Sequence, residues 1–193
     1  MTDKLSVRTL GDMRPVLMSA DVSAPDIFYY MLRGGVTLGN VTTLEPGQAG
    51  REYIKTLGHY HPYDFSETYR VLEGEAFMLL QKRKIGTDNL PIDDEIEEFK
   101  VVKLSAGDSL TLPLHFGHVL VNIGSTFLIT RDDSPSDPAS VALHPHADYE
   151  PIRKLGGVAF YCVNEGGSPA LIKNPHYKYI GATDLAGVPV IEQ

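Results

Sequence analysis

The sequence predicts an all-β protein, built as a sandwich or small barrel of short strands. Short runs of β-branched or aromatic residues recur along the chain. The 13 prolines and 18 glycines separate these runs where turns are needed. No long amphipathic pattern interrupts the series, so we expect helices to be short.

The expected strands follow one another through most of the chain. In order they are Ile27–Leu32, Val36–Leu44, Tyr69–Leu72, Ala76–Gln81, Phe99–Leu104, Ser109–Leu112, Val119–Ile123, Phe127–Thr130 and Val158–Val163. Turn signals stand near or between them, at Pro46-Gly47, Glu73-Gly74, Ala106-Gly107-Asp108, Gly124-Ser125 and Gly166-Gly167. Strands of this length and spacing are typical of a sandwich or barrel.

The remaining segments are expected to be short helices, a loop and a tail. Val7–Met13 and Asp148–Lys154 are candidates for short helices. Gly86–Glu98 is polar and contains a proline, which favours a long hairpin loop. Asn174–Gln193 has little periodicity and is expected to wrap the surface as a tail. We therefore expect one domain over residues 1–193, with its core at about 27–163 and a tail at 174–193.

Length and composition limit the class of protein. A chain of 193 residues suits one domain, since domains commonly have about 50–250 residues. No stretch approaches the roughly 18 apolar residues that span a bilayer, so no membrane is expected as a partner. The N-terminus lacks a secretory h-region and the one cysteine, Cys162, has no partner within the chain, which favours the cytosol.

The net charge of −8 argues against broad attraction to nucleic acid, which depends on Lys and Arg neutralising phosphates. A small anion is still compatible with the chain, because its binding depends on the potential of a local pocket. Much of the negative charge lies in one run, at Asp93-Asp94-Glu95 and Glu97-Glu98, which we expect to be solvated loop.

Histidine and glutamate residues form a candidate metal site. His59 and His61 are two positions apart, so in an extended strand both side chains project from one face. Glu67 follows a short turn and completes a set of two histidines and one carboxylate, a grouping used by non-haem iron sites. A histidine pair alone occurs often by chance. A later block, Gly107-x5-Pro113-x4-His118-x3-Asn122, supplies a fourth candidate ligand, His118.

These two blocks resemble the two cupin motifs. The first is Gly58-His59-x-His61-x5-Glu67-x6-Gly74, with a longer gap before the glutamate than is usual. In the second block, His115 stands where a glycine is usual after the proline. Over roughly Val7 to Lys178 the chain resembles the archaeal-type, cupin glucose-6-phosphate isomerases, through Val41-Thr42-Thr43-Leu44-x-Pro46-Gly47, Thr56-x-Gly58-His59-Tyr60-His61, Met78-Leu79-Leu80-Gln81 and Val121-Asn122-Ile123-Gly124.

The resemblance implies a cupin jelly-roll barrel and a homodimeric, metal-dependent enzyme that interconverts glucose 6-phosphate and fructose 6-phosphate. It implies one divalent ion per subunit, with iron first and Mn, Ni, Co or Zn also compatible. The implied metal ligands are His59, His61, Glu67 and His118. The implied substrate contacts are Tyr29, Thr42, Thr56, Gly58, Tyr69 and Tyr149, with His146 near the substrate.

One departure concerns the phosphate of the substrate. Where the family often has a lysine before the Gly-His pair, this chain has Leu57. The phosphate charge would then be met by hydroxyls, by the Gly58 amide, or by a cation such as Lys55 or Arg51.

An aldose–ketose isomerase moves a proton or hydride between C1 and C2 of the open-chain sugar. A metal acting as a Lewis acid would stabilise charge on the adjacent oxygens, and an octahedral ion with four protein ligands keeps two positions free. A carboxylate on a cation is a weakened base. The sequence therefore leaves three routes open: Glu67 shifting off the metal, a separate base such as His146, or a hydride shift. Tyr69 is expected to share the face of Glu67, where it contacts substrate, orients the carboxylate or only packs.

Other readings of the same residues remain. A different metal-dependent cupin enzyme, such as a dioxygenase, would use the same ligands, and a non-catalytic sugar-binding cupin is a third class. The Thr56-Leu57-Gly58 segment and the Val121–Gly124 block favour the isomerase. Tyr60 is expected to point away from the metal, into the core or a dimer interface, and Cys162 to be buried.

Overall fold

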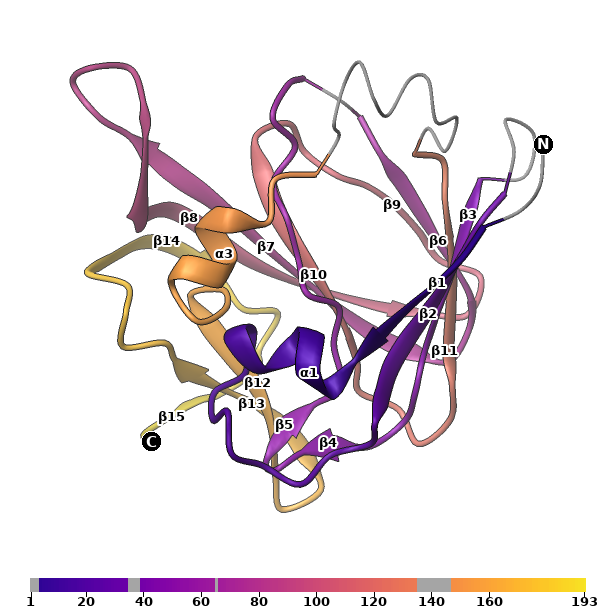
Figure 1. The fold of residues 1–193 in the computed structure, drawn as a ribbon. Helices are drawn as coiled ribbons and strands as arrows, with labels where there is room; N and C mark the ends of the chain where they lie inside the picture. Colours follow the sequence, from indigo (N-terminus) through magenta and orange to yellow (C-terminus); the bar gives the residue numbers. More distant parts are fainter. Residues whose placement is uncertain (1–3, 35–38, 65, 135–146) are drawn as a thin grey trace.

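The fold of the chain is seen in a computed structural model, which describes residues 4–34, 39–64, 66–134 and 147–193 (Figure 1). Most of the ordered elements are strands, which confirms the all-β prediction. The helices are short: α1 (Leu10–Met13), the 3-10 turn η1 (Arg14–Val16) and α3 (Glu150–Lys154).

The strands of the described residues form three sheets, and the strands of each sheet are given in spatial order. The first sheet contains β1 (Lys4–Thr9), β2 (Ile27–Arg33), β3 (Asn40–Leu44), β11 (Leu128–Asp132), β6 (Thr68–Glu73) and β9 (Ser109–Thr111). The second contains β10 (Phe116–Asn122), β7 (Glu75–Ile85), β8 (Pro91–Ser105) and β14 (Tyr179–Asp184). The third contains β15 (Val190–Ile191), β13 (Ser168–Lys173), β12 (Phe160–Glu165), β5 (Glu52–Tyr53) and β4 (Gln48–Ala49).

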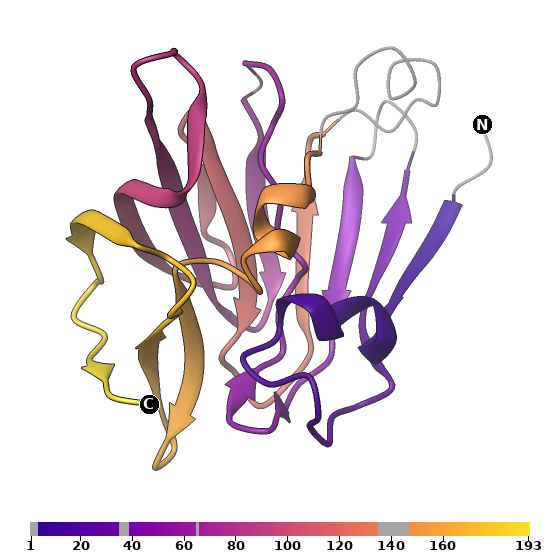
Figure 2. The ribbon, with the colours of Figure 1, turned by 60° about the vertical axis from the view of Figure 1, so that its left-hand side comes forward.

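The first two sheets lie on opposite sides of the molecule, and the third lies below them in the view of Figure 1 (Figures 1 and 2). Antiparallel pairing joins the strands within the first sheet and joins β10, β7 and β8 in the second. This double-sheet arrangement agrees with the jelly-roll barrel expected of a cupin. The extent of the domain, expected to be the whole chain, stays a prediction.

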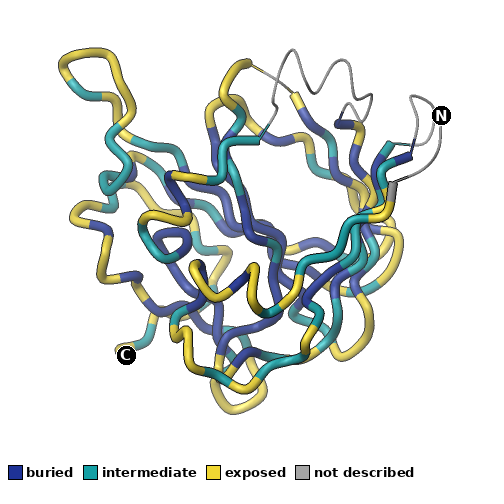
Figure 3. The backbone as a smooth tube through the Cα atoms, in the orientation of Figure 1, coloured by how far each residue is buried: buried dark blue, intermediate teal, exposed yellow. Residues whose placement is uncertain are grey.

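The core lies between the sheets, where the strand residues are buried (Figure 3). Every residue of β10 is buried, including the polar His118 and Asn122, so the strand is covered on both faces. In β3 burial alternates, so that Thr42 and Leu44 point inward while Val41 and Thr43 are only partly covered. This alternation brings the Thr42 side chain to the interior of the barrel.

The prediction of a long loop at Gly86–Glu98 was wrong. The turn between β7 and β8 is confined to residues 86–90, and Pro91–Glu98 belongs to β8. The acidic run is also not solvated loop, because it lies in β8 and its carboxylates pair with cations of β7, with Lys154 of α3 and with Lys178 just before β14. These pairs include Arg83–Asp93 (2.6 Å), Lys84–Glu95 (2.8 Å), Lys82–Glu97 (3.0 Å) and Lys178–Asp94 (2.6 Å).

The predicted tail at 174–193 also proved to contain strands. Tyr179–Asp184 pairs in parallel with β8, and Val190–Ile191 pairs in parallel with β13. Only the second half of the helix expected at Val7–Met13 is helical. Strand β1 extends to Thr9, and the capped helix α1 begins at Leu10. The helix expected at Asp148–Lys154 is present as α3. Residues 36–38 of one expected strand lie outside the described residues.

Candidate metal centre

The two motif blocks meet at a pair of histidines. His59 and His118 face each other across an antiparallel bridge, with His118 N–H donating to His59 C=O at 3.0 Å and the reverse bond at 3.3 Å. Opposed residues in such a pair place their side chains on one face. The two imidazole centroids are 4.3 Å apart. The segment before β6 and strand β10 are thereby held in register at the site.

Gly58 permits this close approach. Its φ of 81° lies in the left-handed region, and a Cβ there would stand 2.3 Å from Val119 Cγ2. Any larger residue would push the two histidine-bearing segments apart. The glycine of the Gly58-His59 pair is therefore needed for the geometry of the site.

Glu67 and His61 complete the cluster. The Glu67 carbonyl accepts a hydrogen bond from the Leu112 N–H (2.8 Å), which fixes the backbone just before β6. Its Oε2 lies 3.2 Å from His61 Nε2 and 3.5 Å from His118 Nε2. One ligand atom from each of His59, His61, Glu67 and His118 can be chosen so that all lie within 4.8 Å of one another. The structure thus brings together the whole predicted ligand set, and three nitrogens with one carboxylate oxygen suit a divalent transition metal.

The two departures from the usual motifs do not disturb the cluster. His61 and Glu67 are in contact in spite of the longer gap between them. His115 adopts the left-handed conformation, with φ of 67°, that the usual glycine would adopt. Its side chain is exposed and pairs with Asp64 at 3.5 Å, so His115 belongs to the turn and not to the ligand set.

The electrostatics of the cluster suit a cation. Burial alone would raise the pKa of Glu67, but the hydrogen bond from His61, the charges of His118 and His59 and the Ser134 hydroxyl outweigh it and lower that pKa to about 2. Burial lowers the pKa of His118 to about 4, against the opposing effect of Glu67. At neutral pH the carboxylate is ionised and His118 is neutral, which are the forms that ligate a metal.

Tyr69 lies beside the cluster, as expected from its position two residues after Glu67. Its hydroxyl is 3.3 Å from His118 Nε2. Burial and the nearby carboxylates of Glu67 and Asp132 raise the pKa of Tyr69 well above its ordinary value. The phenol therefore stays protonated and can donate a hydrogen bond inside the site.

A pocket opens onto the cluster and collects the predicted substrate contacts. Tyr29, Thr42, Thr56, Gly58, Tyr69 and Tyr149 all line it. Thr56 Oγ1 accepts the Leu120 N–H at 3.0 Å, which leaves its own proton for another acceptor. The Tyr29 hydroxyl lies 3.4 Å from the Leu57 N–H, and burial raises the pKa of Tyr29 to about 12. Predicted His146 lies outside the described residues.

Four further polar residues line the pocket that the sequence did not single out: Arg33, Asn40, Asp132 and Ser134. Burial and the charge of Glu67 raise the pKa of Asp132 to about 7, although hydrogen bonds from Asn40 and Ser134 oppose the shift. These residues follow no motif spacing, and only the pairing of β2, β3 and β11 brings them to the site. No local signal in the sequence would have found them.

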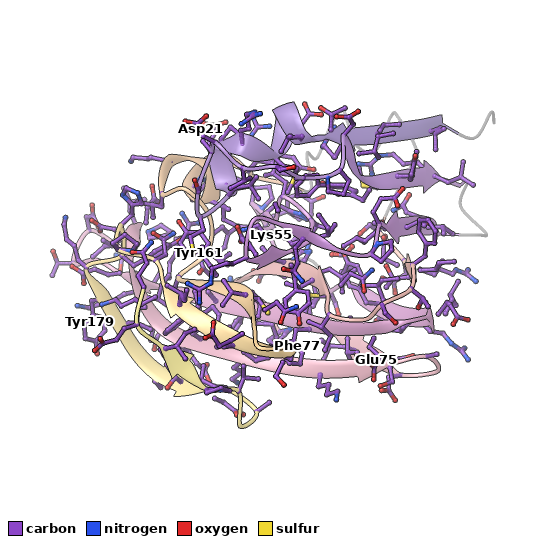
Figure 4. The ribbon with its side chains drawn as sticks, turned by 90° about the horizontal axis from the view of Figure 1, so that it is seen from below. Asp21, Lys55, Glu75, Phe77, Tyr161 and Tyr179 are labelled. Atoms are coloured by element: carbon purple, nitrogen blue, oxygen red, sulfur yellow. The ribbon has the colours of Figure 1, made fainter. Side chains whose placement is uncertain are left out.

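Neither cation suggested for the phosphate lies in this pocket. Lys55 is buried, where its ammonium donates to Val16 C=O (2.7 Å) and to Glu52 and lies 5.3 Å from the Tyr161 ring (Figure 4). Arg51 is at the surface and pairs with Glu165 at 2.6 Å. Among the described residues, Arg33 at the end of β2 is the cationic side chain that lines the pocket.

Three other predicted positions have structural roles. Tyr60 points into the core, where its hydroxyl accepts a hydrogen bond from Gln81 Nε2 at 2.7 Å. Asn122 is fully buried and donates to Thr126 C=O (2.9 Å) while accepting from Gly124 N–H (3.1 Å), so it braces a turn. Cys162 is buried, as expected.

Comparison with known proteins agrees with the resemblance. The family model described as "Glucose-6-phosphate isomerase (GPI)" matches residues 31–178. The chain belongs to this family. That match contains all four residues of the cluster and most of the pocket lining.

Relatives of this family are only moderately similar. The "Putative glucose-6-phosphate isomerase 1" of Rhizobium meliloti is 29% identical over 81% of this chain and 65% of its own length. The "Glucose-6-phosphate isomerase" of Pyrococcus furiosus is 30% identical over 71% of this chain and 62% of its own. The chain thus spans less than two thirds of the length of these relatives.

Among solved structures, the oxalate decarboxylase of Lactobacillus farciminis matches with a TM-score of 0.36 and 17% identity, over 69% of this chain and 29% of that one. Within the described residues, no helix has the length and apolar character needed to cross a membrane.

Proposed function

We propose that this chain is a metal-dependent aldose–ketose isomerase that interconverts glucose 6-phosphate and fructose 6-phosphate. The observation that carries the proposal is the convergence of His59, His61, Glu67 and His118 at the wall of a polar pocket, in a chain of the glucose-6-phosphate isomerase family. We further propose one divalent ion per subunit, iron first, with Mn, Ni, Co or Zn compatible with the same donors.

The four side chains fit such an ion. They are largely shielded from solvent, and the Glu67 carboxylate is ionised by virtue of its lowered pKa. When bound, the ion would supply Lewis acidity that stabilises negative charge on the sugar oxygens. The chain's own residues then have to hold the sugar, keep water out and move a proton.

The pocket residues suit a phosphorylated sugar. The hydroxyls of Thr42 and Thr56 line the pocket together with the guanidinium-bearing Arg33. Arginine binds phosphate through several N–H donors and keeps its charge. We propose that Arg33 takes over the role of the lysine that Leu57 replaces.

Proton movement has two protein candidates. Glu67 lies within the cluster, but its histidine and Ser134 partners already lower its pKa to about 2, and a bound cation would weaken it further as a base. His146 is the other candidate, and a hydride shift would need neither. Tyr69, kept protonated by burial, is suited to donating a hydrogen bond to a sugar oxygen.

The proposal extends to the assembly and its location. A homodimer is the state the resemblance implies, and sedimentation of the purified chain at several concentrations tests it. The cytosol remains the expected location.

A coupled assay tests the activity. The purified, metal-loaded chain should interconvert glucose 6-phosphate and fructose 6-phosphate, and a chelator should abolish the activity until metal is restored. Absence of interconversion in protein that carries metal by elemental analysis would overturn the proposal. Oxygen consumption with a diol or thiol substrate would instead favour a dioxygenase.

A further inference from the structure

The two oxygens of the Glu67 carboxylate have different surroundings. Oε2 faces the histidines, 3.2 Å from His61 Nε2 and 3.5 Å from His118 Nε2. Oε1 accepts a hydrogen bond from the hydroxyl of Ser134. One oxygen therefore faces the cluster while the other is occupied by a side chain from beyond the end of β11.

Ser134 is itself held in place by a buried network. Its backbone N–H donates to Asp132 Oδ1 (3.0 Å), and Asn40 Nδ2 donates both to that oxygen (2.8 Å) and to Ser134 C=O (3.2 Å). The exposed fractions of Asn40, Asp132 and Ser134 are 3%, 6% and 5%. Three hydrogen bonds between these buried groups restrict Ser134 to one arrangement, although Asn40 Oδ1 has no hydrogen-bond partner among the described residues.

The fold directs this network at Glu67. Asp132 is paired in the first sheet with Asn40 of β3 on one side and with Tyr69 of β6 on the other. The same strand, β6, begins directly after Glu67. Three neighbouring strands thus fix the position of the Ser134 hydroxyl relative to the carboxylate.

We propose that Ser134, held by Asp132 and Asn40, is a positioning residue that makes Glu67 offer a single oxygen to the bound metal ion. This inference rests on the proposed metal site. Four ligands with one atom each leave two of the six positions of an octahedral ion, whereas a glutamate binding through both oxygens leaves one. An open-chain sugar needs two positions to place both of its reacting oxygens on the ion. Ser134 therefore keeps the second position free.

The number of water molecules on the bound ion tests the proposal without a substrate. In Mn²⁺-loaded protein, the paramagnetic relaxation of water protons is proportional to the number of exchanging water ligands. Ser134→Ala frees Oε1 to bind, so we expect about a twofold drop in inner-sphere relaxation, from about two waters to about one. Mn²⁺ affinity should be unchanged or higher, and KM for the sugar phosphate should rise.

Matched variants separate positioning from structural support. Ser134→Thr keeps the hydroxyl and should keep the wild-type relaxation. Thr130→Val is the control on the preceding strand β11, because Thr130 is fully buried and its Oγ1 has no hydrogen-bond partner among the described residues. It should leave both relaxation and affinity unchanged. Ser134→Cys, with a weak donor of similar size, should give an intermediate value and serves if the alanine variant does not fold.

Wild-type relaxation in fully Mn²⁺-loaded Ser134→Ala or Ser134→Cys would overturn the proposal. If Ser134→Ala binds Mn²⁺ more weakly but keeps the wild-type number of bound water molecules, Ser134 only supports the structure of the site. That result would also overturn the proposal. Wild-type protein that binds Mn²⁺ but lacks isomerase activity would contradict the proposed function, while the relaxation of the variants would still decide the role of Ser134.

Discussion

The carboxylates of Glu52 and Glu67 are both almost fully buried, but a lysine neutralises the first while histidines and a hydroxyl surround the second. Glu52, 1% exposed, is paired with the ammonium of Lys55 and accepts the Met18 N–H at 2.9 Å. Glu67, 2% exposed, faces histidines and the Ser134 hydroxyl. Among the described residues, the ion pairs of Glu67 involve neither lysine nor arginine.

This difference separates a structural ion pair from a ligand site. A buried carboxylate is costly unless a counter-charge compensates it. At Glu52 the chain supplies that charge from Lys55, and the pair is complete. At Glu67 the chain supplies imidazole nitrogens and a hydroxyl, none of which carries a permanent charge, and such a site suits a bound cation. Removing the partner of Glu52 should therefore lower the free energy of unfolding. Removing a partner of Glu67 should release the bound metal ion.

The largest effect is expected from loss of a ligand at the Glu67 cluster. His59→Ala and His118→Ala should each lose the metal and lower kcat/KM by more than about 100-fold, since even loss of a residue that only hydrogen-bonds a metal ligand costs about 10–100-fold. Elemental analysis and the coupled assay measure this, and circular dichroism checks that the strands remain. Full metal occupancy in either variant would show that the ligand set is wrong.

Loss of the cation at Glu52 should act on stability alone. Lys55→Met leaves a buried carboxylate uncompensated and should lower the free energy of unfolding by about 3–5 kcal/mol, measured by urea denaturation. The kcat/KM of the folded protein should be unchanged because Lys55 does not line the pocket. The double variant Glu52→Gln with Lys55→Met should recover much of the stability. A loss of activity in folded Lys55→Met would contradict the separation.

A smaller effect is expected at the phosphate end of the pocket. Arg33→Ala should raise KM for glucose 6-phosphate by about 10–100-fold, because a hydrogen bond to a charged group contributes about 1.5–3 kcal/mol. Arg51→Ala is the matched control, since Arg51 pairs with Glu165 at the surface. Steady-state kinetics compare the two. If Arg33→Ala and Arg51→Ala have the same KM for glucose 6-phosphate, Arg33 does not contact the substrate.

The smallest effect is a pH dependence from Asp132. Its pKa is raised to about 7, so between about pH 4 and 7 the folded state keeps a proton that the unfolded chain has released. Stability therefore falls as pH rises through this window. In metal-free protein, Asp132→Asn should remove this slope, so its stability relative to wild type should rise by up to about 1.4 kcal/mol per pH unit. Urea unfolding at pH 5, 6 and 7 measures the difference, and a constant difference would contradict it.

The strand pattern and the His59–His61 pair were predictable because both depend on local periodicity, whereas His118 came from a distant block that resembles the second cupin motif. Alternating and continuous apolar runs predicted most of the barrel strands, and two-residue spacing placed His59 and His61 on one face. Pro91–Glu98 was mistaken for a loop, because its polarity is compensated by cations that lie on other segments. The strand at Tyr179–Asp184 was missed because its pairing with β8 leaves no periodic signal at an exposed edge.

By itself, the sequence determined the fold class, the four residues of the cluster and most of the hydroxyls of the pocket. Only the tertiary structure decided how they are used. It removed Lys55 and Arg51 from the pocket, brought in Arg33, and set Ser134 against one oxygen of Glu67. The physical reason is that charge compensation in a barrel acts between strands far apart in the chain. The spacing of residues along the sequence does not predict which cation pairs with which carboxylate.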